Sequence, residues 1–418
     1  MALKRELGLL STVLYGVGII LGAGIYALIG VGAGLAGNML WLAFLVSAII
    51  AIFTGLSYAE LSSMFPRAAA EYHYTKKAFR FEEFSFVIGW ILVVGTVIAA
   101  STVALGFAGY FVNMFGGDKI IVAAALIFLM SALNYVGIRE SAKFNNFASI
   151  IEASGLILVV VIWLLFPPQV PGNVLELPET GLAGIMGAIG VIFFAYIGFE
   201  NIANLAEEVK DSRRNIPLAL IISLLISTIL YILVSIAAVS ELGSAALSES
   251  DAPLTMVVER GLGEYASILS VIALFATGNT VLIFLIAASR ILYGMSAGKS
   301  LPVFLSRTDS HGTPMYAIAA TAVAAAVIAS SGDIKTVAQL TDIGVFMAYA
   351  AVNAALIALA GRKLKRSFTS PRLFGIPALA WVGIGSSLFM LTTFELDLWL
   401  LEIAIILVGL IFFMLSKK

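Results

Sequence analysis

Long apolar stretches alternate with short polar connections along the whole chain. Because the hydrocarbon core of a bilayer takes about 20 apolar residues in a helix, this pattern predicts an all-α integral membrane protein. We expect twelve spans, and their predicted ranges are 9–36, 39–63, 84–112, 119–137, 146–166, 182–206, 217–240, 265–295, 314–331, 338–360, 373–394 and 398–416. None of the connections between them is long enough for a soluble domain.

The composition agrees with this pattern. The 418 residues are 61% hydrophobic and only 12% charged, and their mean hydropathy is +1.05. Soluble domains are about 25% charged, so a soluble protein is excluded. The absence of cysteine excludes disulfides, thiolate metal sites and cysteine nucleophiles. The N-terminal stretch lacks a signal-peptide cleavage pattern, so we expect the first span to be retained.

The basic residues predict the orientation of the spans. If the N-terminus lies inside, 21 of the 24 Lys and Arg residues fall at the inner ends, and only Lys119, Arg260 and Lys335 fall outside. The positive-inside rule therefore predicts a cell-membrane protein with both termini in the cytoplasm. The inner connections 66–74 and 207–217 mix charges of both signs, and we expect them to be solvated amphipathic connectors.

The first span carries an unusual glycine pattern. Residues 16–30 contain five glycines, each of which costs a helix interior about 1 kcal/mol relative to alanine. This pattern predicts a helix break near Gly22, Ala23 and Gly24. At membrane depth a break exposes N–H and C=O groups that lipid cannot satisfy, and the carboxylate and ammonium of an amino acid match them. The alternative is a small-residue face on which helices pack closely.

The sixth span is interrupted in a similar way. Its middle reads Gly198-Phe199-Glu200-Asn201, and an ionisable group at that depth marks a functional site by default. Alternatively, Glu200 satisfies backbone groups that the break frees. Because spans 1 and 6 are five helices apart, they cross the membrane in opposite senses. Interrupted helices at matching positions of two inverted halves are typical of a transporter site near the midplane.

At these residues the chain resembles the amino acid–polyamine–organocation (APC) superfamily, in its amino acid permease branch. The resemblance covers residues from about 8 to 395, although Ala69 and Ala70 replace the usual glycines after span 2. The segments that carry it are 16–26, 66–74, 194–200, 207–217 and 289–302. It implies the leucine-transporter-like fold, with inverted repeats at 1–166 and 167–360 and two further helices in 361–418.

The resemblance also implies how a substrate is held. The amides of Ala23 and Gly24 should meet the substrate carboxylate, in agreement with the positive end of the outer half-helix. The carbonyls of Ile20, Phe194 and Ile197 should meet its ammonium. The complete expected substrate-binding set is Ile20, Gly22, Ala23, Gly24, Phe194, Ala195, Ile197, Glu200 and Phe284.

The expected substrate is a small or medium neutral amino acid. Phe284 faces the cavity in the registers of the family, and Ala23 leaves room beside it. Glu200 could instead attract a cationic side chain.

Coupling is predicted to depend on Glu152 in span 5, where several proton-coupled relatives carry a lysine. On the predicted range, Glu152 lies about 10 Å from the inner end of its helix. Burial favours a protonated carboxyl, and alternating hydration could load and release the proton. Asn279 in span 8 falls where this fold has its second cation site, and it could partner Glu152 or join helices. Sodium binding aided by Glu152 is the competing hypothesis. The structural alternative is a permanently protonated Glu152 that makes an interhelical hydrogen bond.

The leading hypothesis is a secondary active transporter that moves amino acids by alternating access, by proton symport. Exchange, transport of a cationic amino acid or amine, and a membrane-embedded amino acid sensor are the alternatives. No Ser/His/Asp set or His-Glu-x-x-His motif lies in the spans, so we do not expect an enzyme. We expect no cofactor, no metal, no nucleic acid and no obligate protein partner; the expected partners are an amino acid and the lipid bilayer.

Overall fold

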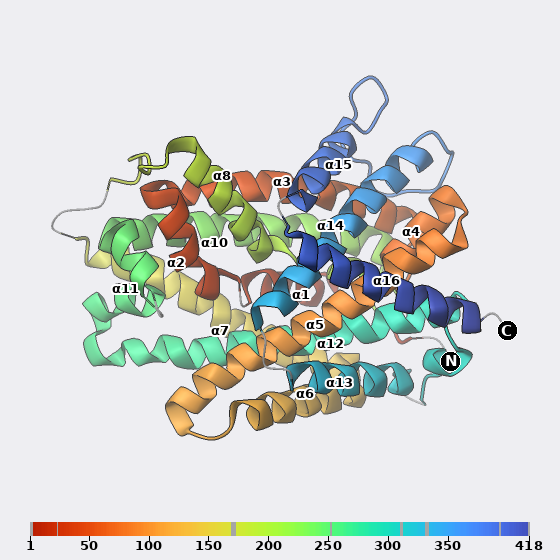
Figure 1. The fold of residues 1–418 in the computed structure, drawn as a ribbon, viewed down its shortest axis with the longest axis horizontal. Coiled ribbons are helices and arrows are strands. Elements are labelled where there is room, and N and C mark those ends of the chain that lie inside the picture. The colour runs from red at the N-terminus through yellow and green to blue at the C-terminus, as the bar shows by residue number, and fades with distance from the viewer. Residues whose placement is uncertain are drawn as a thin grey trace.

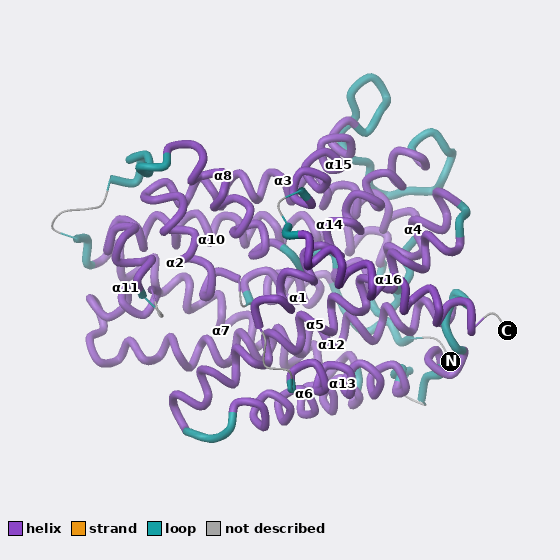
Figure 2. The backbone as a smooth tube through the Cα atoms, in the orientation of Figure 1, coloured by secondary structure: helices purple, strands orange, loops and turns teal. Residues whose placement is uncertain are grey.

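The computed structural model describes residues 3–22, 24–168, 173–250, 253–309, 312–330, 334–392 and 394–416. Within these ranges the chain forms a bundle of helices without a named strand (Figures 1 and 2). The α-helices are α1 Leu9–Leu21, α2 Gly24–Ala36, α3 Leu40–Met64, α4 Ala70–Phe79, α5 Glu82–Phe115, α6 Lys119–Val136, α7 Ile138–Leu165, α8 Gly181–Ile192, α9 Asn201–Asn204, α10 Ser212–Glu249, α11 Pro253–Leu262, α12 Ile268–Ala297, α13 Met315–Ala329, α14 Ile334–Leu359, α15 Ala378–Leu391 and α16 Leu396–Ser416. The 3₁₀ helices are η1 Gly37–Met39, η2 Phe193–Tyr196, η3 Gly263–Ser267 and η4 Val303–Ser306.

The helices have the length and composition of membrane spans. Among the described residues, ten helical stretches are long and apolar enough to cross a membrane, and α13 and α15 are shorter apolar helices. Large apolar side chains such as Leu400, Leu407 and Ile411 on α16 are mostly exposed, as expected of a surface that faces lipid. In Figure 1 both ends of the chain lie at the same end of the bundle as α4. The prediction of a multi-pass helical membrane protein is confirmed.

The first span is interrupted, as its glycines predict. Helix α1 ends at Leu21 and α2 begins at Gly24. Gly22 leaves the helical conformation (φ −8, ψ −117), and its N–H still donates to the carbonyl of Gly18 over 3.2 Å. Ala23, which was predicted to lie at the break, is outside the described residues.

The sixth span is interrupted as well. Helix α8 ends at Ile192, η2 follows, and α9 resumes only at Asn201. Gly198 lies between them with a φ of +118, a conformation that side chains disfavour. A Cβ at this position would lie 2.8 Å from Cγ1 of Ile19 on α1. The break in span 6 is therefore packed directly against the end of α1.

Several predicted helix boundaries are wrong, and α10 runs Ser212–Glu249 rather than 217–240. Helix α7 begins at Ile138 rather than at residue 146, because its first polar turns are helical although they are not hydrophobic. Helix α15 begins at Ala378 rather than at residue 373, because Leu373 and Ile376 exchange backbone hydrogen bonds of 2.9 and 3.0 Å in a tight turn.

The charge pattern predicted that the inner connections are solvated. The structure instead buries two of their acidic side chains. Glu71 on α4 and Glu208 after α9 are fully or almost fully buried. Glu208 accepts two hydrogen bonds, of 3.0 and 2.9 Å, from Nε and Nη2 of Arg290. Arg290, expected at the inner end of span 8, lies inside α12 and is itself fully buried. A buried charge needs such a partner, so this ion pair fastens the segment after α9 to α12.

Candidate functional site

A cavity lies where the two interrupted spans meet, bounded further by α5, α12 and α14. It holds about 470 Å³ of empty space, which includes space open to solvent. Its lining residues are Ile19, Ile20, Gly24, Ala99, Thr102, Val103, Phe194, Ala195, Ile197, Thr280, Phe284 and Thr341. Of the predicted substrate-binding residues, six line it: Ile20, Gly24, Phe194, Ala195, Ile197 and Phe284.

The cavity depends on glycines at the break of the first span. A Cβ at Gly24 would lie 2.7 Å from Cα of Ala195 in η2, which is backbone and cannot give way. A Cβ at Gly22 would collide with Oγ1 of Thr280 on α12. The backbone of the first span therefore approaches η2 and α12 more closely than any larger residue allows.

The break brings backbone polar groups to the cavity. The first N–H groups of α2, beginning at Gly24, have no partner within their own helix, and they form its positive end. The carbonyl of Ile20, at the end of α1, accepts a hydrogen bond from the hydroxyl of Tyr231. The carbonyl of Phe194 accepts the N–H of Ile197 over 3.1 Å. An anionic group is favoured beside α2, and a cationic group beside the carbonyls of the breaks.

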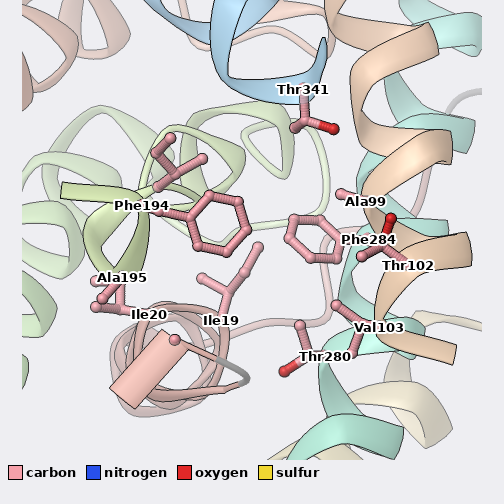
Figure 3. Close-up of a pocket in the computed structure, with 12 residues that line it drawn as sticks. Ile19, Ile20, Ala99, Thr102, Val103, Phe194, Ala195, Thr280, Phe284 and Thr341 are labelled. Atoms are coloured by element: carbon pink, nitrogen blue, oxygen red, sulfur yellow. The ribbon is translucent and has the colours of Figure 1, made fainter. Parts of the chain in front are cut away.

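The side chains of the cavity are apolar or hydroxylic. Thr102, Thr280 and Thr341 are its polar side chains, and each donates to a backbone carbonyl at 2.9 to 3.2 Å. The aromatic rings of Phe194 and Phe284 point into the cavity from η2 and α12 (Figure 3). No charged side chain is among the twelve lining residues. This lining suits a ligand with an uncharged side chain.

Glu200 is buried beside the break in span 6 but does not line the cavity. Its Oε2 accepts hydrogen bonds from the N–H of Gly198 at 2.9 Å and from the hydroxyl of Tyr349 at 2.6 Å. Its Oε1 accepts from the side chain of Asn201 at 3.0 Å. Glu200 therefore satisfies a backbone N–H that the break frees, and its hydrogen bond with Tyr349 links the break to α14.

Neither Glu152 nor Asn279 lines the cavity. Glu152 is fully buried on α7, and neither carboxyl oxygen has a hydrogen-bond partner among the described residues. The amide of Asn279 donates to Ser149 on α7 over 3.2 Å, not to Glu152. A Cβ at Gly18 would meet Nδ2 of Asn279 at 2.7 Å. With the predicted helix start corrected, Glu152 lies about 21 Å along α7 from Ile138 rather than about 10 Å from the helix start.

Three residues of this region were not predicted from the sequence. Tyr231 on α10 donates to the carbonyls of both interrupted spans, Ile20 and Ala195, the latter over 3.1 Å. Thr102 and Thr341 line the cavity. Each is a polar group within an apolar span, which is the signal that could have identified it.

We expect Tyr231→Phe to lower the thermal denaturation temperature of the purified protein. The substitution removes the single hydroxyl donor that two buried carbonyls share, at a cost of about 1–3 kcal/mol. Tyr135→Phe is the matched control, because Tyr135 is 47% exposed and should tolerate the change. An unchanged denaturation temperature in Tyr231→Phe would mean that the hydroxyl does not support the two breaks.

The fold and the site define a polytopic helical membrane protein with a small uncharged cavity between two unwound helices. Residues 7–412 match the sequence profile of the family described as amino acid permease, so the chain belongs to the amino acid permease family. It is 30% identical to the branched-chain amino acid permease BcaP of Bacillus subtilis, covering 100% of this chain and 94% of the relative. It is 29% identical to the methylthioribose transporter of the same organism, with the same coverage. It is 31% identical to the mitochondrial cationic amino acid transporter 3 of Arabidopsis thaliana, over 82% of this chain and 60% of the relative.

Proposed function

We propose that this protein is a secondary active transporter of small or medium neutral amino acids that works by alternating access. The observation that carries the proposal is the cavity at the meeting point of the two interrupted spans. The substrate carboxylate binds the free N–H groups at the start of α2, including that of Gly24. The ammonium binds carbonyls of the breaks, and the side chain contacts Phe194 and Phe284.

The proposed architecture has twelve spans with both termini in the cytoplasm. Residues 1–166 and 167–360 form two inverted five-helix repeats, and residues 361–418 add two helices. The position of the breaks in spans 1 and 6 supports this arrangement. The excess of basic residues at the inner ends supports the orientation and a location in the cell membrane.

Proton symport through Glu152 is the proposed coupling mechanism. Glu152 is a buried carboxyl without a hydrogen-bond partner among the described residues, and a group of this kind can exchange a proton whenever water reaches it. The hydroxyl of Tyr26 on α2 donates to the backbone carbonyl of Glu152 over 3.4 Å, which links Glu152 to the outer half of the first span. A proton on Glu152 can therefore influence the geometry of the substrate cavity. Sodium binding or exchange without a coupled ion are the competing outcomes.

We expect proteoliposomes that contain the protein to accumulate neutral amino acids in preference to charged ones. The cavity lining carries no charged side chain, so an ammonium or guanidinium on the substrate side chain would lose its hydration without gaining a partner. Uptake of a radiolabelled panel that includes alanine, leucine, arginine and glutamate tests this selectivity. A strong preference for arginine over alanine and leucine would contradict the neutral-substrate proposal.

A further inference from the structure

A second hollow, far larger than the substrate cavity, lies at the end of the bundle that carries α4 and both termini. This basic pocket holds about 1200 Å³ of empty space, which includes space open to solvent. Its lining residues are Phe65, Arg67, His73, Lys76, Lys77, Arg80, Glu82 and Arg362. Five of these side chains are cations and one is a carboxylate, so the lining carries a net charge of about +4 with His73 neutral. None of the eight residues belongs to the substrate cavity.

Four of the five cations come from residues 67–80 and the fifth, Arg362, comes from the turn after α14, and their charge is incompletely neutralised. Lys76 forms an ion pair of 3.1 Å with Glu82. Arg67, Lys77 and Arg80 form no ion pair within 4.0 Å with any residue in the part of the chain that the structure describes. The general excess of basic residues at the inner ends of spans explains why there are many cations at this end of the bundle. It does not explain why five of them line one pocket. Charges of one sign that line a concave surface attract a counter-ion strongly.

His73 lines the pocket beside three of its cations. Burial and the neighbouring cations Arg67, Lys76 and Lys77 lower the pKa of His73 to about 4. The imidazole is therefore neutral at physiological pH, and it is a hydrogen-bonding group that can face a bound anion. Because a nearby anion favours the imidazolium, His73 is also a built-in probe of occupancy.

The pocket lies at the boundary between membrane and water. Its carboxylate Glu82 is the first residue of the membrane-spanning helix α5. Two neighbouring aromatic side chains, Phe81 and Phe84, are 68% and 40% exposed, and the ring of Phe84 packs on that of Phe79 at 5.6 Å. Exposed aromatic surface beside a basic hollow suits a ligand that has both a phosphate and an acyl chain. A soluble phosphate compound would make no use of it.

We propose that the basic pocket binds the phosphate headgroup of an anionic phospholipid from the leaflet at this end of the helices. The phosphate oxygens accept hydrogen bonds from Arg67, Lys77 and Arg80. The acyl chains lie along Phe81, Phe84 and the adjacent surface of α5. Basic pockets at membrane-embedded helix ends bind anionic headgroups in this way, and the site is independent of the proposed substrate cavity.

The first test measures the pKa of His73 in lipid nanodiscs. His73 and His311 are the two histidines of the chain, so His311→Gln leaves His73 as a single histidine that can be labelled with ¹³C and titrated by NMR. We expect phosphatidylglycerol nanodiscs to raise this pKa relative to phosphatidylcholine nanodiscs. Part of the increase reflects the potential of the anionic surface and is common to every variant. The remainder should disappear in Lys77→Gln/Arg80→Gln and persist in the matched control Lys210→Gln/Arg214→Gln, which removes two exposed cations elsewhere.

The second test measures retention of phosphatidylglycerol by native mass spectrometry of the purified protein. Loss of two cations near a headgroup should weaken binding about 30-fold in Lys77→Gln/Arg80→Gln, and the control variant should bind as the unmodified chain does. Arg67→Gln is a second, single-site variant with a smaller loss expected. Equal retention by the pocket and control variants would overturn the proposal, as would an equal pKa increase of His73 in both. A full increase caused by inorganic phosphate alone in phosphatidylcholine nanodiscs would assign the pocket to a soluble anion instead.

Discussion

Gly24→Val is expected to lower amino acid affinity at least 100-fold while the purified protein remains folded and monodisperse. The substitution places a branched side chain where a Cβ alone would already lie 2.7 Å from the backbone of Ala195. The first turn of α2 must then move away from η2, and its N–H groups no longer meet the substrate carboxylate. Losing two hydrogen bonds to a charged group costs about 3–6 kcal/mol, which corresponds to at least 100-fold in affinity.

Gly106→Val is the matched control for this substitution. Gly106 lies in the membrane-spanning helix α5, and a Cβ there would have no neighbour within 4 Å. We expect this variant to bind substrate normally, which separates the effect of the position from the general effect of valine in place of glycine. Equilibrium binding of a radiolabelled amino acid in detergent measures both variants. Unaltered binding in Gly24→Val would remove the substrate carboxylate from the start of α2.

Glu152→Gln is expected to abolish concentrative uptake and to retain exchange of internal for external substrate. Glutamine keeps the shape of the side chain but cannot carry a proton, so the substrate gradient is no longer linked to the proton gradient. In the unmodified protein, uptake should rise as the external pH falls, because protonation of Glu152 from outside loads the carrier. It should need no sodium.

Glu402→Gln is the matched control for the coupling experiment. Glu402 is also a buried carboxyl in a membrane-spanning helix, with one oxygen unpaired among the described residues, but it lies on α16 and does not line the substrate cavity. We expect this variant to concentrate substrate normally in sodium-free proteoliposomes with an imposed pH gradient. Strict sodium dependence at constant pH would exclude proton symport, and so would a Glu152→Gln variant that still accumulates substrate against its gradient.

The interrupted helices were predictable from the sequence because their causes are local. Glycines at Gly22 and Gly24 weaken the first span, and Gly198 with its adjacent polar residues weakens the sixth, so each break follows from its own stretch of chain. Six residues predicted from these breaks and from span 8 do line one cavity.

The remaining features depend on contacts between distant segments. Tyr231 supports both breaks, but its partner Ile20 is 211 residues away in sequence, and nothing near either residue indicates the pairing. The burial of Glu208 likewise depends on Arg290, 82 residues further along. The start of α7 was misplaced because hydropathy locates the part of a helix in lipid and not its polar first turns.

The binding geometry is tested most directly by competition between an amino acid and the amine that lacks only its carboxylate. In the unmodified protein, leucine and 3-methylbutylamine should be compared as competitors of a radiolabelled neutral amino acid. The amine keeps the ammonium and the side chain but offers nothing to the N–H groups of α2, so we expect it to bind at least 100-fold more weakly than leucine. Comparable inhibition by the two compounds would contradict recognition of the substrate carboxylate at the break between α1 and α2.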